Sequence, residues 1–192
     1  MLHRVFAVAI TLLVAPSASA VTLNVSGGQL FGASGVIVDG IPYDVQFLEG
    51  TCIDLYNGCE TSDFTFQTEE AAEAASQALI DQVLLDGPQG AFDTNPGLTN
   101  GVDSGAGFGQ IHTPYVANQF NAAVIFVFND DITTNAGPPP PGDFFSTFSR
   151  PRDNTDLYAV WSETVVPEPS TGLLMCLGLV AFAGQRRSRG RS

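Results

Sequence analysis

The chain has 192 residues, a formal net charge of −13, twenty glycines and twelve prolines. Hydrophobic residues make up 44% and charged residues 14%, which excludes an intrinsically disordered chain, and the many glycines and prolines favour a turn-rich, mostly β domain. All twenty acidic residues lie between Asp39 and Glu168. Such an acidic region repels phosphate groups, so it excludes nucleic-acid binding.

The first twenty residues contain the three parts of a secretory signal peptide. Arg4 gives a basic start, residues 5–14 form an apolar run, and Ala18 and Ala20 form a small-residue exit. We predict that residues 1–20 direct the chain to the Sec machinery and that signal peptidase cleaves after Ala20. The alternative is a buried first helix, which the basic flank and the small-residue exit argue against.

Residues 21–165 are predicted to form one exported, acidic, β-rich domain. Alternating or continuous apolar residues predict six strands, at residues 21–25, 36–38, 43–48, 63–67, 122–128 and 156–161. Asp39 and Gly40 supply the positive φ values that a tight hairpin turn between the second and third strands requires. Residues 89–114 are predicted to be a long surface loop, and residues 138–142 a stiff extended loop.

One helix is predicted, beginning after Thr68 and ending before Gly87. Thr68 caps the first turn, early glutamates complement the helix dipole, and a stripe of apolar side chains follows helical spacing. The stripe consists of Ala71, Ala75, Leu79 and Val83. The fold class is therefore α+β, a mainly antiparallel β-sheet with one principal α-helix packed on it.

The end of the chain, residues 166–192, combines a proline motif, an apolar stretch and a basic tail. The motif consists of Val166, Pro167, Glu168 and Pro169. The basic tail contains Arg186, Arg187, Arg189 and Arg191. The apolar stretch between them, residues 172–184, is short for a spanning helix, but a membrane segment held at the inner face would end in arginines whereas a core helix would not. A permanent tail anchor is the alternative to a removable one.

These three features resemble the PEP-CTERM sorting signal of Gram-negative bacteria. The resemblance implies recognition by an exosortase, a membrane-embedded cysteine transpeptidase, and cleavage near Pro167 to Pro169. It also implies transfer to the cell surface or to the exopolysaccharide matrix. Members of this family are substrates of the sorting machinery and are not part of its catalytic apparatus.

Two cysteines, Cys52 and Cys59, enclose a turn-forming hexapeptide in a chain predicted to enter an oxidising compartment. A local disulfide is the leading hypothesis, since a metal site would need more ligands than two thiols and one histidine supply.

Side-chain oxygens at Asp93, Asn95 and Asp103 lie in a glycine-rich segment, as a calcium site requires. The pattern lacks the acidic residue that closes an EF-hand loop, and Asx turns in a solvated loop explain the same residues. Calcium binding is therefore kept as a weaker hypothesis, and no other cofactor is expected.

His112 is the histidine expected in the mature domain, and no nucleophile elbow, zinc motif or phosphate-binding loop accompanies it. A structural or surface role is the simpler interpretation. Aromatic residues near the end of the domain offer a carbohydrate platform, although core packing is their commoner use. They are Phe144, Phe145, Phe148, Tyr158 and Trp161.

The sequence therefore predicts a non-enzymatic exported protein that has a structural or binding role in the extracellular exopolysaccharide matrix of a biofilm. The alternatives are a secreted hydrolase acting on a matrix polysaccharide and a calcium-linked adhesion module. A carboxylate pair for hydrolysis cannot be recognised from spacing along the chain.

Overall fold

The computed structural model describes residues 20–103, 107–130 and 144–164. The proline motif, the basic tail and residues 1–19 of the predicted signal peptide lie outside the described residues, as does the predicted loop at 138–142.

Seven of the described strands form one sheet in the order β1-β2-β3-β9-β6-β7-β8. Their bounds are β1 (Thr22–Ser26), β2 (Gln29–Val38), β3 (Ile41–Thr51), β6 (Phe108–Ala117), β7 (Asn121–Asp130), β8 (Phe144–Pro151) and β9 (Thr155–Glu163). A separate two-stranded sheet contains β4 (Asp86–Gly87) and β5 (Gly90–Ala91). The helices are α1 (Cys52–Leu55), α2 (Glu69–Gln82) and two 3₁₀ turns, η1 (Thr61–Asp63) and η2 (Pro96–Leu98).

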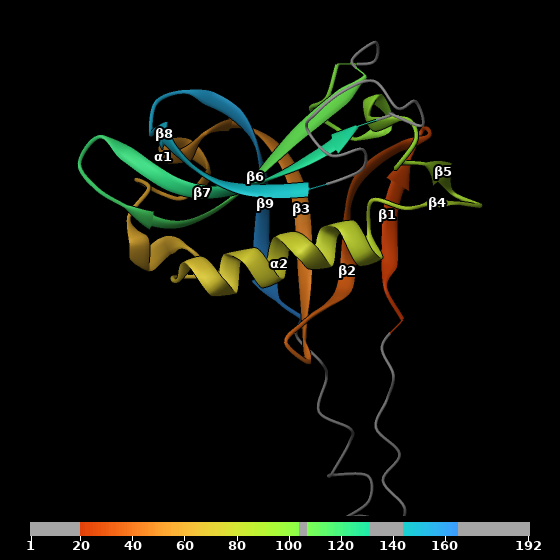
Figure 1. The fold of residues 1–192 in the computed structure, drawn as a ribbon, viewed down its shortest axis with the longest axis horizontal. Helices are drawn as coiled ribbons and strands as arrows, with labels where there is room; N and C mark the ends of the chain where they lie inside the picture. The colour runs from red at the N-terminus through yellow and green to blue at the C-terminus, as the bar shows by residue number, and fades with distance from the viewer. Residues whose placement is uncertain (1–19, 104–106, 131–143, 165–192) are drawn as a thin grey trace, which may run out of the picture.

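The large sheet has two antiparallel halves, β1-β2-β3-β9 and β6-β7-β8. A single parallel pair, His112 on β6 with Tyr158 on β9, joins them. Figure 1 shows the strands of the second half running across those of the first. Together with the one principal helix, this confirms the α+β class.

The predicted hairpin is confirmed and is longer than expected. Asp39 and Gly40 connect β2 to β3 with φ values of 49° and 82°. Two positive φ values give this two-residue turn the twist that matches the flanking strands. The predicted strands at residues 21–25, 122–128 and 156–161 correspond to β1, β7 and β9.

Helix α2 begins where predicted, with the Thr68 hydroxyl accepting a hydrogen bond from the Ala71 amide at 3.3 Å. It ends at Gln82, four residues before the predicted end. The Gln82 side chain bonds both backbone groups of Ile37 on β2, and Val83 and Leu84 are both fully buried. The backbone amides of Val83 and Leu84 both donate to the Leu79 carbonyl, at 3.0 and 2.8 Å, so the regular helical bonding pattern stops here.

Two hydrophobic clusters lie on the two faces of the sheet. The larger one packs α2 against both halves and includes Val45, Phe47 and Ile125. The smaller one lies on the other face, under α1. It consists of Cys52, Tyr56, Cys59, Phe64, Ala122, Val124 and Tyr158. Each face of the junction between the halves is therefore covered by its own element.

The predicted strand at residues 63–67 is wrong. Asp63 belongs to η1, and Phe64 and Phe66 are buried in the two different clusters. The alternating pattern arises because both phenylalanine side chains are buried although the segment is irregular. The Thr65 hydroxyl between them donates a hydrogen bond to the Trp161 carbonyl at 2.6 Å, which joins this segment to β9.

The predicted surface loop at residues 89–114 is also wrong, because β6 begins at Phe108 and continues through Pro114. Proline has no amide to donate, and the strand accommodates it where the β6–β7 register shifts between Pro114 and Val116. The edge strand β8, which pairs with β7, was not predicted.

The described chain begins and ends at one end of the sheet, beside the β2–β3 turn. Thr22 pairs with Ser34 on β2, and Glu163 pairs with Tyr43 on β3. Thr164 then bonds Asp44 through its hydroxyl at 2.8 Å. Helix α1 follows the opposite end of β3, and Figure 1 shows it far from both ends of the described chain.

Within the part of the chain that the structure describes, no helix combines the length and apolar character needed to span a membrane.

Candidate functional site

Three loops meet at the end of the domain that lies opposite Thr164. They are residues 52–59 within the disulfide, residues 118–120 between β6 and β7, and residues 152–154 between β8 and β9. We call these three loops the distal loop cluster. Loops held on a rigid scaffold are common positions for binding sites.

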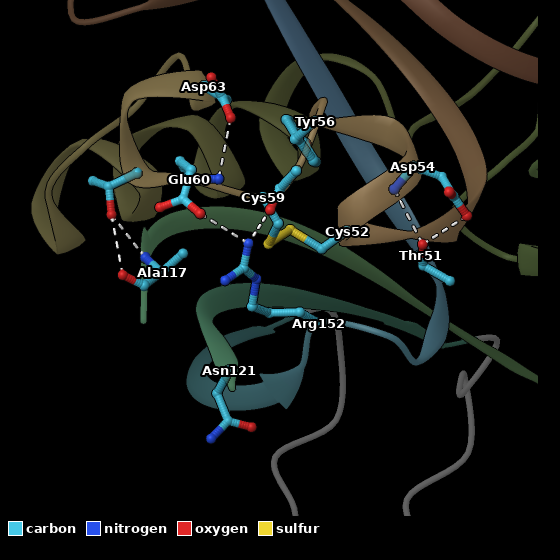
Figure 2. Close-up of a disulfide and its surroundings, with 12 residues drawn as sticks. Thr51, Cys52, Asp54, Tyr56, Cys59, Glu60, Asp63, Ala117, Asn121 and Arg152 are labelled. Atoms are coloured by element: carbon cyan, nitrogen blue, oxygen red, sulfur yellow. Dashed lines mark hydrogen bonds and ion pairs between the residues drawn. A yellow bond between two sulfur atoms is a disulfide. The ribbon is translucent and has the colours of Figure 1, made fainter. Parts of the chain in front are cut away.

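The disulfide between Cys52 and Cys59 closes the first of these loops, as the sequence predicted (Figure 2). Both cysteines are fully buried. Asn57, Gly58 and Cys59 have φ values of 49°, 117° and 61°. Left-handed backbone is costly for residues other than glycine, so the bridge holds a conformation that the free loop would populate poorly.

Arg152 lies in the third loop of the distal loop cluster and bonds to the other two. Figure 2 shows it beside the disulfide loop, residues 52–59. Its guanidinium donates to the Asn118 carbonyl at 3.1 Å, to the Gly58 carbonyl, and to the Glu60 carboxylate at 3.1 Å. Its backbone amide donates to the Phe120 carbonyl at 3.1 Å. The planar guanidinium has five donors, which is why one side chain satisfies several carbonyls.

The segment after the disulfide is fastened to β6. Glu60 and Asp63 form a reciprocal capping box around η1. The Thr61 hydroxyl accepts a bond from the Ala117 amide at 2.9 Å and lies 3.4 Å from the Ala117 carbonyl, to which it donates (Figure 2). The distal loop cluster is thus tied to the sheet on both sides of the bridge.

A shallow pocket of about 440 Å³ opens on the distal loop cluster. Its lining consists of Ile53, Gly58, Gln119, Phe120, Arg152 and Asp153. Phe120 is 71% exposed and Ile53 is 43% exposed. This pocket was not predicted from the sequence, where its one signal is a phenylalanine inside the polar turn Asn-Gln-Phe-Asn at residues 118–121.

Arg152→Lys is expected to lower the free energy of unfolding by about 1 to 2 kcal/mol, because one ammonium group cannot reach both carbonyls in the guanidinium geometry. Glu60→Gln serves as the matched control and should cost less than about 0.5 kcal/mol, since Glu60 is 69% exposed. Urea denaturation of the two variants measures both values. An equal loss in both would contradict the role given to the carbonyl bonds.

His112 is buried where the two halves of the sheet join, and its side chain is 3% exposed. Its Nδ1 lies 3.9 Å from Asp156 Oδ2, and Asp156 is held by Arg150 at 2.9 Å. Burial lowers the pKa of His112 to about 4; Asp156 opposes this shift, and Arg150 adds to it. His112 is therefore neutral at pH 7, and in this structure it lies beneath the surface rather than in an open cleft.

The predicted calcium ligands lie in or near the segment that follows β4. Asp86, which was not predicted, accepts hydrogen bonds from the amides of Asp93 and Thr94 at 3.1 Å each. The bonds from Thr94, and to a lesser extent the bond from Asp93, lower the pKa of Asp86. Burial, Asp86 and Asp130 raise the pKa of Asp93. Among the described residues no group of three or more His, Cys, Asp or Glu side chains is arranged to hold a metal ion. Calcium binding through Asp93, Asn95 and Asp103 stays a prediction.

Tyr158 and Trp161 pack in the core, which was the favoured interpretation of the aromatic residues near the end of the domain. Tyr158 and Trp161 are buried in different clusters, and Trp161 packs edge-on against Tyr43 and Phe66. Phe148 is exposed and lies on β8. Tyr158 and Trp161 are buried because they lie on β9, whose two faces are covered by the cluster under α1 and by the cluster under α2.

A family model of the PEP-CTERM protein-sorting motif matches residues 165–187. The chain therefore carries this sorting signal, directly after the last described residue of the domain. The signal implies export, transient anchoring in the membrane and processing by an exosortase. Comparison with curated proteins and with solved structures found no match.

Proposed function

We propose that this protein is a non-enzymatic component of the cell surface or extracellular matrix of a Gram-negative bacterium, where it has a structural or binding role. The observation that carries the proposal is the PEP-CTERM motif at residues 165–187. Signal peptidase would release the N-terminus after Ala20, and an exosortase would remove the tail near Pro167 to Pro169.

The described domain supports a binding role over catalysis. His112 is buried and has a pKa of about 4, which is well below the range that suits a general base at neutral pH. The exposed polar and aromatic groups of the distal loop cluster are instead held in place by a disulfide and by Arg152. A rigid exposed surface of this kind favours recognition.

Mass spectrometry of the protein released from the cell surface tests the processing. We expect an N-terminus at Val21 and a C-terminus that lacks the apolar stretch and Arg191. A strain without its exosortase should retain the full tail on membrane-bound protein, which provides the control. Recovery of the intact tail on soluble extracellular protein would overturn the proposal.

A further inference from the structure

The side chain of Phe120 is displayed on a turn that is fixed by hydrogen bonds. The Asn118 side chain accepts from the amides of Phe120 and Asn121 at 2.9 Å each, and the Phe120 carbonyl accepts from the Arg152 amide. The backbone is therefore held while the ring stays 71% exposed. The ring shares its pocket with a second exposed apolar side chain, Ile53, so together they offer a partner an apolar surface on ordered loops.

The groups around this ring suit a ligand rich in hydroxyl groups. Gln119 and Asp153 are exposed and line the same pocket as Phe120 and Ile53. The amide both donates and accepts hydrogen bonds, the carboxylate accepts them, and the ring offers a flat apolar face. A sugar ring has the complementary pattern, with C–H groups on its faces and hydroxyl groups around its edge.

The charges favour a neutral sugar over an acidic one. Arg152 is already engaged by two carbonyls and by Glu60, and Asp153 adds a negative charge to the pocket. Between the two terminal signals the chain has two arginines, Arg150 and Arg152, against nineteen acidic residues. A polyanionic polymer would be repelled by this surface.

We propose that the pocket of the distal loop cluster binds a neutral glycan. Phe120 stacks on a sugar ring, Gln119 and Asp153 bond its hydroxyl groups, and Arg152 is a positioning residue that fixes the loops. The loops that line the pocket follow Thr51 and precede Thr155, at the end of the β3–β9 ladder opposite Glu163, so a molecule still anchored by its tail would present them away from the membrane. This inference rests on the proposed function and names the class of its partner.

Affinity electrophoresis of the exported protein tests the inference, with gels that contain dextran, hydroxyethyl cellulose or galactomannan as neutral probes and alginate as an anionic one. At least one neutral probe should retard the protein. Phe120→Ala should weaken that retardation roughly tenfold or more, because truncating a central aromatic contact typically has an effect of this size. The matched control is Phe108→Ala, which removes a 51% exposed phenylalanine outside the pocket and should bind as the unaltered protein does.

The inference is overturned if no neutral probe retards the protein, if alginate alone does, or if both phenylalanine variants bind equally well. A cooperative urea transition for each variant, with a midpoint close to that of the unaltered protein, verifies that the fold is intact. Mass spectrometry of the same preparation separates the two proposals. Correct termini without neutral-glycan binding overturn this inference alone, whereas an intact tail on soluble protein overturns the proposed function.

Discussion

Replacing Cys52 and Cys59 together by alanine is expected to lower the free energy of unfolding by about 2 to 3 kcal/mol. The bridge closes a loop between positions seven residues apart, and the chain-entropy relation gives about 2.5 kcal/mol for a loop of that size. The loop also contains three consecutive residues with positive φ, which the variant no longer constrains. Urea denaturation of the oxidised protein and of the double variant measures the difference.

Reductant provides the control for the disulfide experiment. It should lower the midpoint of the unaltered protein to near that of the double variant and leave the variant unchanged. Thiol titration of the denatured, unreduced mature protein should find no free cysteine, since Cys176 lies in the predicted tail. Two free thiols, or equal stability with and without reductant, would rule out the bridge.

Acid should destabilise the domain through His112. Its pKa is about 4 in the folded protein and about 6.5 when unfolded, so below pH 6.5 the unfolded chain takes up a proton that the folded protein excludes. The stability that His112 contributes is complete above pH 6.5 and is lost as the pH falls toward 4. Between pH 7.5 and pH 5 the loss should be about 2 kcal/mol.

The comparison with His112→Gln isolates this effect from the titration of the many carboxylates. The difference in free energy of unfolding between the two proteins should change by about 2 kcal/mol over that pH range. NMR titration of the His112 ring in the unaltered protein provides a second measurement. A difference that does not depend on pH, or a ring that titrates near 6.5, would contradict the prediction.

Local signals in the sequence were sufficient for the elements whose physics is local. The Asp39-Gly40 turn, the Thr68 cap and the apolar run of β7 each depend on residues close together in the chain, and each is present in the structure. The end of α2 was misplaced because Gln82 bonds to Ile37, a partner 45 residues away.

The elements that were missed depend on distant partners. β6 contains glycine, histidine and proline, and it is a strand because β7 and β9 pair with it. The distal loop cluster is assembled by Arg152, whose acceptors at Asn118 and Gly58 are 34 and 94 residues away. The spacing of residues along the chain does not predict that these three loops come together. The disulfide and the sorting motif were found because each is encoded in a short segment.

The attachment of Thr164 has a mechanical consequence for a tethered molecule. While the tail still anchors the molecule, before the exosortase removes it, a polymer held at the distal loop cluster would place tension along β9. Nine paired positions join β9 to β3, in the middle of the sheet, and Thr164 adds its bonds to Pro42 and Asp44. A load in this direction shears the nine paired positions together instead of unzipping them one by one, so separating β9 from β3 requires the whole ladder to break at once.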